Sequence, residues 1–367
     1  MHARRFFPFG VLSVILYLST GGGGASSVLA KGLAEDYGAY LAAVKAGAPA
    51  DEIRRLAGQV YAGAPGDRPA LKGPAAYNLA KAEEAMGERD AALAHFAESV
   101  ELMRTAFGRD DSRLLWPYWD YGRALSAAGE DGRALDYLDL ASRVFDHNED
   151  GIDPKISLLI DLDRIRVASL QDDLRHMYAV MNRLESRLDQ AGTDRPYFEG
   201  MVNFWRGKEL LARKSRRAAA KRFARAIELL LQRFDESDET VLMARTFHLQ
   251  ALEEAGRSDE ATAECVAIAR ARSDEENAKF IPLFRVQPAY PRGAIEIGQQ
   301  GHVVVSLTVT PEGRTADWKI VESSPRGKFD RAALEAVKKF RYAPRIVDGK
   351  AVAAKDVLYR FTFEVED

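Results

Sequence analysis

The chain has 367 residues, of which 47% are hydrophobic and 29% charged, and its formal net charge is -3. This length and apolar content are enough for two or three packed domains. The small negative charge argues against a general nucleic-acid-binding protein, because such proteins present an excess of Lys and Arg to the phosphates. No motif that combines aromatic and basic residues for RNA is present either. Nucleic acid is therefore not expected as a partner.

The first thirty residues have the pattern of a secretory signal peptide. Arg4 and Arg5 precede an apolar run at residues 6–18, and a Gly-rich stretch then leads to small residues at Ala30. A basic start, a short apolar core and small residues at a cleavage site define such a signal. The apolar run is about thirteen residues long, whereas a membrane-spanning helix needs roughly twenty. We therefore expect cleavage after Ala30, with retention of 1–30 as a short N-terminal anchor as the alternative.

The following 245 or so residues, 31–275, contain a repeating pattern. Three rows of buried-type residues recur at intervals of 42 or 85 positions: Ala92, Ala134, Ala219 and Ala261; Phe96, Leu138, Phe223 and Cys265; and Ala80, Gly122 and Gly207. Gly87, Gly129 and Gly256 fall where two helices of one repeat would turn. A small residue at the helix contact, a turn residue and a large apolar residue are what a helix-turn-helix repeat needs to stack on its neighbour.

The pattern resembles tetratricopeptide repeats in a longer form of about 42 residues. The interval of 85 predicts one degenerate repeat with a one-residue insertion, around Ile165, Met177, Met181 and Leu184. A further weak unit is expected at the N-terminal end, with its turn near Gly47. We therefore expect an all-α solenoid of five or six helix pairs, which would offer a surface to extended peptides or partner proteins. The alternative is a plain helical bundle with coincidental spacing.

The C-terminal segment has the pattern of a small α/β module. From His302 to Thr310 apolar and polar residues alternate, which predicts a half-buried strand. Pro311-Glu312-Gly313 provides a turn, and a second strand is expected at about 315–323. Apolar residues then recur at helical spacing between Phe329 and Phe340, which predicts one amphipathic helix.

A third strand is expected from Val357 to Val365, where apolar residues alternate with Leu358, Arg360, Thr362 and Glu364. The module is therefore a β-β-α-β unit with too few strands to close a barrel. An open sheet ends in an edge strand with unpaired backbone groups, and such an edge is either blocked or used to bind an extended peptide. The last strand has no Pro and few charges, so we expect its edge to bind.

Four motifs stand in this segment in a particular order: Gln287-Pro-Ala-Tyr-Pro, Gly298-Gln-Gln-Gly, Glu322-Ser-Ser-Pro and Phe340-Arg-Tyr-Ala-Pro. In order and spacing they resemble the C-terminal domain of the TonB family, the periplasmic proteins that pass inner-membrane energy to outer-membrane transporters. The resemblance covers residues from about 280 to 367. It implies that the last strand captures an extended segment of a transporter and that residues around the Tyr-Pro pair contact the transporter's plug.

Carried over to this sequence, the resemblance implies eleven partner-binding residues: Gln287, Pro288, Tyr290, Pro291, Val357, Leu358, Tyr359, Arg360, Phe361, Thr362 and Phe363. For Tyr290-Pro291 a structural role is an equal alternative, because the residue before Pro is biased towards extended backbone. The pair would then fix the approach of the chain to the sheet.

The chain departs from TonB energy transducers in two respects. Those proteins resemble one another in having an uncleaved N-terminal helix, which engages an inner-membrane proton-channel complex, and a Pro-rich spacer. Here the apolar run is short, the 14 prolines are scattered, and a repeat array takes the place of the spacer. Two functions remain open: a periplasmic TonB-type component that binds an outer-membrane transporter, with or without energy coupling, and an envelope scaffold that docks proteins without energy transfer.

Catalytic or metal-binding chemistry is not expected. The six histidines are dispersed, and none pairs with another His or with the single cysteine at metal-ligand spacing. Cys265 falls on a row otherwise held by Phe and Leu, so it is interpreted as a small buried apolar residue. No Gly-rich phosphate loop is present outside the signal region. We expect no enzyme, no metal and no cofactor.

The sequence thus predicts an α+β multidomain protein in three parts. They are a signal peptide or short anchor at 1–30, an all-α tetratricopeptide-like solenoid at 31–275, and a small β-β-α-β TonB C-terminal-like domain at 276–367.

Overall fold

The computed structural model describes residues 24–364 and divides into two compact units, one ending at Ala191 and the other beginning at Gly192. The predicted apolar run at 6–18 lies outside the described residues. Cleavage of the signal peptide after Ala30 therefore stays a prediction. The first described helix, α1, begins at Gly24 and continues through the expected cleavage position at Ala30.

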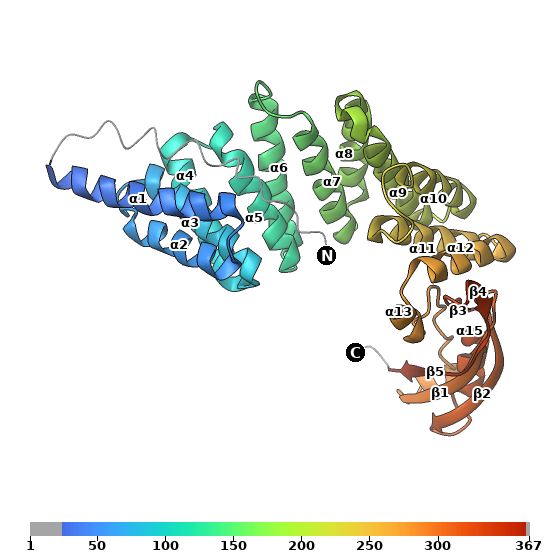
Figure 1. Ribbon diagram of the computed structural model, residues 1–367. Coiled ribbons are helices and arrows are strands. Elements are labelled where there is room, and N and C mark those ends of the chain that lie inside the picture. The colour runs from blue at the N-terminus through green and yellow to red at the C-terminus, as the bar shows by residue number, and fades with distance from the viewer. Residues whose placement is uncertain (1–23, 365–367) are drawn as a thin grey trace. The chain divides into compact units, whose positions relative to one another are not determined.

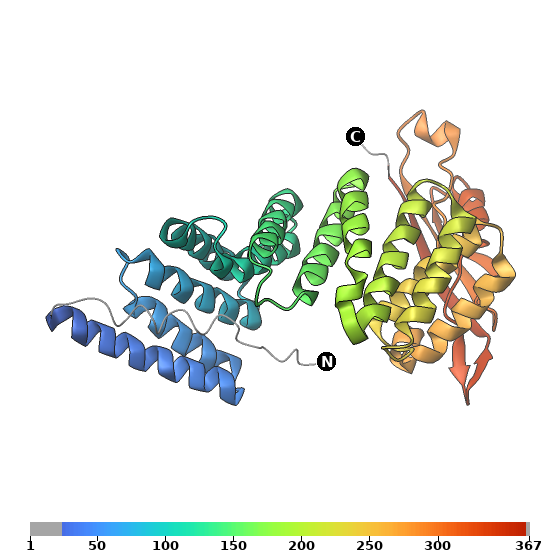
Figure 2. The same ribbon diagram turned by 90° about the horizontal axis from the view of Figure 1, so that it is seen from above.

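The first unit consists of antiparallel helix pairs (Figures 1 and 2). Its helices are α1 (Gly24–Ala46), α2 (Ala50–Gly63), α3 (Pro69–Met86), α4 (Arg89–Phe107), α5 (Leu115–Ala127), α6 (Asp131–His147), α7 (Lys155–Leu170) and α8 (Leu174–Ser186). A short 3-10 helix, η2 (Ser112–Leu114), precedes α5, and another, η3 (Leu188–Asp194), follows α8. Each helix packs mainly on the helices next to it in the chain, as a stacked repeat requires.

The second unit continues with two helix pairs and ends in a small sheet domain. Its elements are α9 (Arg195–Ala212), α10 (Arg216–Leu230), α11 (Glu239–Glu254), α12 (Ser258–Ala271), α13 (Asp274–Ala278), α14 (Arg292–Ile295), β1 (Gly301–Val309), β2 (Thr315–Ser324), α15 (Asp330–Val337), β3 (Arg345–Val347), β4 (Lys350–Val352) and β5 (Ala354–Phe363). Helices α1 to α12 form six pairs within residues 24–364, which agrees with the expected five or six.

The turns inside the pairs confirm the repeat period. The turn residues have a left-handed φ, at Gly47 (66°), Gly87 (78°), Gly129 (81°), Asp172 (54°), Lys214 (59°) and Gly256 (74°). They are 40, 42, 43, 42 and 42 positions apart, so the first interval is two residues short of the period, and the inserted residue lies between the turns at Gly129 and Asp172. Two of the turns carry a non-glycine residue at a left-handed φ, which costs free energy. That is why glycine spacing alone could not locate them.

The rows of small and large residues meet across the helix pairs. A Cβ atom on Gly122 would lie 2.9 Å from Leu138, and one on Gly207 would lie 2.6 Å from Phe223. Larger side chains at these glycines would separate the helices. In the last pair the sizes are exchanged, because Leu249 stands in the row of small residues and Cys265 in the row of large ones, and both are fully buried.

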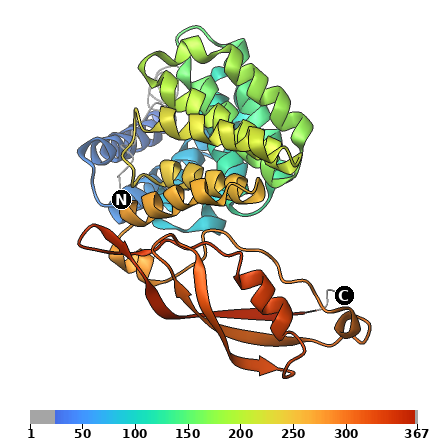
Figure 3. The same ribbon diagram turned by 90° about the vertical axis from the view of Figure 1, so that its right-hand side faces the viewer.

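The sheet domain has the strand order β2-β1-β5, with both pairings antiparallel. Helix α15 packs on β1 and β2 (Figure 3). The predicted inward face of β1 is confirmed, since Val303, Val305, Leu307 and Val309 are all buried. Phe329 and Phe340 are buried too but flank α15, which is shorter than the predicted helix. The second hairpin, β3–β4, was not predicted; Asp348 and Gly349, both with positive φ, form its turn.

A buried arginine joins the sheet domain to helices α11 and α12. Arg341 is only 2% exposed, and its Nε donates to the Glu253 carboxylate at 2.5 Å. Its other nitrogens donate to the backbone carbonyls of Ser258 and Glu312. The backbone of Arg341 also pairs with Phe284, on the segment that leaves the helices. The last helix pair and the sheet domain are therefore one packed body.

Cys265 lies at the same junction. A Cβ atom on Gly313, in the β1–β2 turn, would lie 2.8 Å from Cys265 Cβ and 2.4 Å from the Tyr342 carbonyl oxygen. Gly313 also has φ +71°. The Phe or Leu that earlier repeats carry at the position of Cys265 would collide with this turn. The small side chain of Cys265 therefore leaves room for the β1–β2 turn to pack against α12.

Candidate functional site

Strand β5 lies at one edge of the sheet and has β1 as its one neighbour there. Its pairing with β1 runs without interruption from Gly301 opposite Phe363 to Leu307 opposite Val357. Backbone groups of β5 that point away from β1 therefore lie in a regular row. A regular row of free donors and acceptors is what an added strand needs.

Aromatic packing holds β5 from its inner face. The Phe363 ring stacks on Phe329 with centroids 4.3 Å apart, and Phe361 lies 5.7 Å from Phe340. Tyr359 meets Phe340 edge-on at 5.0 Å. Aromatic pairs of this geometry contribute beyond the area that they bury. The strand is thus fixed to the core on one face, while its edge stays free.

The outer face of β5 is polar apart from one residue. Arg360 and Thr362 are exposed, and so is Leu358, at 62%. These three side chains follow each other at period two, as the sequence predicted. A strand added beside β5 would bring its own side chains next to them, where cross-strand pairs contribute to stability.

The opposite edge, β2, is less suited to strand addition. Its pairing with β1 shifts register at two places, between Val304 and Val305 and between Ser306 and Thr308. One irregularity coincides with Asp317, whose φ is +51°. Bulges twist an edge and interrupt its row of backbone groups, and charged side chains add to that protection. The pairing of β2 is thus irregular within its length, whereas that of β5 is regular over 357–363 and shifts once before that stretch, beside Asp356 with φ +58°.

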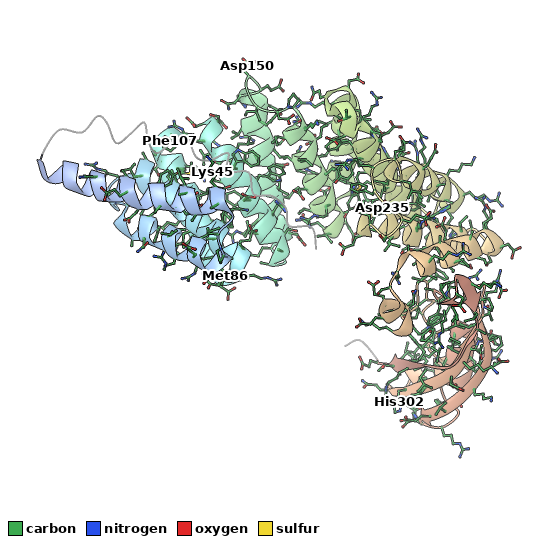
Figure 4. The ribbon with its side chains drawn as sticks, in the orientation of Figure 1. Lys45, Met86, Phe107, Asp150, Asp235 and His302 are labelled. Carbon is green, nitrogen blue, oxygen red and sulfur yellow. The ribbon has the colours of Figure 1, made fainter. Side chains whose placement is uncertain are left out.

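Charge is balanced locally on the outer face. His302 Nε2, on β1, lies 2.7 Å from Glu322 Oε1 on β2, and His302 is labelled in Figure 4. The hydrogen bond from His302 holds the pKa of Glu322 below its ordinary value. Glu322 is engaged by His302, and the exposed Arg360 on β5 forms no salt bridge within the described residues, although its charge also lowers the pKa of Glu322.

The Tyr-Pro stretch reaches the end of β5. Tyr290 donates from its hydroxyl to the Gln299 carbonyl at 2.7 Å, and its ring meets Phe329 and Phe363 edge-on. These contacts favour the structural role for Tyr290. Gln287 is exposed, while Pro288 and Pro291 are half-buried. The structure therefore brings Tyr290 and Phe363 together, and leaves Gln287 open to solvent near the same stretch.

Sequence reasoning missed the residue that fixes this domain to the helices. Arg341 stands between Phe340 and Tyr342, both fully buried. A charged residue between two buried aromatic residues is a signal of a buried ion pair, because a buried charge needs a partner. Its partner, Glu253, is 88 positions away and could not be identified without the fold.

Comparison with protein families identifies the family of the sheet domain. The model described as "Gram-negative bacterial TonB protein C-terminal" matches residues 286–365. Residues 286–365 are a TonB C-terminal domain. The TonB C-terminal domain is preceded by tetratricopeptide repeats, since a tetratricopeptide repeat model matches residues 74–146.

Curated relatives match through the TonB C-terminal domain. Protein TonB of Pseudomonas aeruginosa is 40% identical over 85 residues, which are 23% of this chain and 25% of that protein. Protein TonB of Yersinia enterocolitica is 31% identical over 83 residues, 23% of this chain and 30% of that protein. The chain therefore spans a quarter to a third of the length of the curated relatives that it matches most fully.

Two solved structures resemble separate parts of the chain. The solution structure of the Pseudomonas aeruginosa TonB C-terminal domain is 38% identical and covers 24% of this chain and 90% of that one, with a TM-score of 0.22. The apo quorum sensor NprR of B. thuringiensis covers 72% of this chain and 71% of that one, at 12% identity and a TM-score of 0.51. The second likeness concerns the fold alone. Between residues 24 and 364, no helix has the length and apolar content needed to cross a membrane.

Proposed function

We propose that this protein is a periplasmic adaptor of the TonB type, whose β5 edge binds an extended peptide of an outer-membrane transporter by strand addition. The uninterrupted pairing of β5 from Val357 to Phe363, at the edge of the sheet of a TonB C-terminal domain, is the observation that carries the proposal. The binding surface comprises the backbone from Val357 to Phe363, with Leu358 and Arg360 beside the peptide. Gln287, before the Tyr-Pro pair, also belongs to this surface. The Tyr290 ring packs against Phe363 and so supports the strand.

The repeats supply a second docking surface in this proposal. Stacked helix pairs present one continuous face to a partner protein. Because the ion pair between Arg341 and Glu253 ties the sheet domain to α11 and α12, a partner on the last repeats and a peptide on β5 would be held at a fixed separation. The protein would then bridge a transporter and a second envelope protein. No catalytic step, metal or cofactor is part of this function.

Disulfide trapping tests the strand addition. The variant Leu358→Cys would be mixed with synthetic peptides copying the extended periplasmic segment of a TonB-dependent transporter, with one Cys moved along the peptide. Residues directly opposite on paired strands have Cβ atoms about 4.5–5.5 Å apart, close to the range that a disulfide bridges. We expect trapping at alternate peptide positions, because side chains alternate across a strand.

The matched control is Lys319→Cys on the exposed face of β2. It should trap little peptide, since the β2 edge is irregular. The native Cys265 should not compete, because it is buried and burial raises the pKa of its thiol to about 12. Equal trapping by both variants, or trapping without a period of two, would contradict strand addition at β5.

Energy coupling is the second candidate function. The family match favours it, because "Protein TonB" relatives share this domain. It would require an inner-membrane anchor and contact with a proton-channel complex. The scattered prolines and the repeat array favour the adaptor without energy transfer.

A further inference from the structure

Three rows of side chains cross the outer face of the main sheet and end at β5. The register of the three strands gives these rows as Ser324, His302 and Thr362; Glu322, Val304 and Arg360; and Lys319, Ser306 and Leu358. Paired residues of neighbouring strands share a face of the sheet. A strand added beside β5 would therefore place one side chain next to each of Thr362, Arg360 and Leu358.

The middle row ends in a cation that has no acidic partner. Arg360 is exposed and forms no salt bridge or hydrogen bond within residues 24–364. The acid of its row, Glu322, lies on the far side of Val304 and is bonded to His302 at 2.7 Å. Arg360 acts on Glu322 only at longer range. The place beside Arg360 on an added strand is thus suited to an acidic side chain.

The other charges of β5 restrict such an acid to the middle of the bound peptide. The exposed Asp356 and Glu364 stand four positions before and four positions after Arg360. At about 3.3 Å per residue, each is roughly 13 Å from Arg360 along the strand. A carboxylate beside Arg360 would meet the opposite charge. A carboxylate beside either end would meet a like charge, which is destabilising between paired strands.

The row of Leu358 ends in an apolar side chain. Leu358 is 62% exposed and lies two positions from Arg360 on the same face. Edges that are protected against pairing carry charges or bulges rather than open apolar surface. Leu358 therefore indicates an edge that selects its partner strand, and an aliphatic side chain placed beside it would bury apolar area of both residues.

We infer that β5 selects an extended peptide that carries an acidic residue beside Arg360 and, two positions away, an aliphatic residue beside Leu358. The inference rests on the proposed strand addition and adds to it the chemistry of the peptide. In strand addition the backbone hydrogen bonds supply affinity and the alternate side chains supply specificity. Because a slip of one residue would move the acid to the other face, the pair with Arg360 also fixes the register of the peptide.

Reversible disulfide trapping on the full chain, in a glutathione buffer, tests the inference. The variant Thr362→Cys keeps both Arg360 and Leu358. The probe is the synthetic peptide Thr-Thr-Cys-Thr-Glu-Thr-Leu-Thr-Thr, together with versions in which Gln or Lys replaces Glu. With the peptide Cys opposite position 362, Glu lies opposite Arg360 and Leu opposite Leu358. The same peptides in reverse order serve the opposite strand direction, and only one order should be trapped well.

In that order we expect the Glu peptide to be trapped about threefold more than the Gln peptide, and the Lys peptide about threefold less, as for a charged cross-strand pair. Adding Arg360→Glu should reverse this ranking. The matched control is Arg326→Glu, at an exposed arginine that follows β2, and it should leave the ranking unchanged. Replacing the peptide's Leu by Thr should weaken trapping unless the protein also carries Leu358→Ser.

Circular dichroism verifies that each variant is folded, and Arg360→Gln, which should abolish the ranking, replaces Arg360→Glu if the latter is not. Equal trapping of the Glu, Gln and Lys peptides, equal trapping of both orders, or a ranking unchanged by the loss of Arg360 would overturn the inferred peptide chemistry. So would failure to trap these peptides while Leu358→Cys traps transporter peptides. Strand addition would stand in each of these cases. If neither variant trapped any peptide, strand addition and the inference would both be wrong.

Discussion

At the scale of single residues, the pair of Arg341 and Glu253 carries the junction between helices and sheet. Both are nearly buried, and removing one partner of a buried pair leaves an uncompensated charge, which typically costs about 3–5 kcal/mol. We expect Glu253→Ala to lower the free energy of unfolding of the second unit by about 3 kcal/mol. Urea denaturation followed by circular dichroism and by tryptophan fluorescence, to which Trp318 in the sheet domain contributes, measures this change.

The control is a second ion pair at the same junction, between Arg314 and Asp259. It is exposed, and Asp259 is fully accessible to water. Exposed pairs contribute about 0–1 kcal/mol, so Asp259→Ala should have little effect. Equal losses in the two variants would show that burial of Arg341 is not what stabilises the junction.

Glu264, on α12, makes the stability of the repeats depend on pH. Burial opposes its ionisation, but hydrogen bonds from His248 and Arg245 outweigh burial and hold its pKa below the ordinary 4.5. The ionised carboxylate therefore adds stability above about pH 4.5, and this is lost as pH falls through the lower, folded-state pKa. We expect Glu264→Gln to be less stable than wild type at pH 7, with the difference shrinking as pH falls below 4.5. Urea unfolding at several pH values measures this difference, and a constant difference would contradict the assignment.

At the scale of elements, the repeat is the unit that can be removed. Each helix pair packs mainly on its neighbours, so deleting residues 87–128, one complete period, should leave a shorter array that still folds. The deletion joins α3 to the turn at Gly129, where a left-handed glycine is again available. We expect the helical circular dichroism signal to fall in proportion to the number of residues removed. Thermal unfolding should remain cooperative.

A deletion of 21 residues, half a period, provides the contrast, because it places α3 out of phase with the next helix. If both deletions melted alike, or if the 42-residue deletion were largely unfolded, the array would behave as a single bundle rather than as stacked repeats.

At the scale of the whole molecule, the N-terminus separates the two candidate functions. Energy transfer needs an anchor in the inner membrane, whereas an adaptor needs only export. Among the described core residues of the first helix pair are Leu33, Tyr37 and Tyr40, all beyond the predicted cleavage site, so cleavage after Ala30 would keep them.

We therefore expect the mature protein, isolated from its own cell envelope, to begin at Lys31. N-terminal sequencing or intact mass measures this directly. A protein that still begins at Met1 and stays with the inner membrane would favour the energy transducer over the adaptor.

Local patterns in the sequence were sufficient for the repeat helices, the three strands of the main sheet and the family of the C-terminal domain. Alternation placed β1 and the inner face of β5, because side-chain direction in a strand depends only on position along it. The equal spacing of small and large buried residues predicted the repeated helix pairs. The Asp348-Gly349 turn was a local signal that could have predicted the β3–β4 hairpin, yet it was missed.

Contacts between distant segments were decided by the tertiary structure. The strand order shows that the sheet has two edges, and they differ in where their irregularities lie. The pairing of β2 shifts register at two places, whereas that of β5 shifts once, before Val357. The partner of Arg341 cannot be read from spacing alone, because a side chain's neighbours depend on how the elements pack. The sequence by itself determined what each segment becomes, since propensity and periodicity are local. The fold determined which charges are paired and which edge is free, since those are properties of packing between segments.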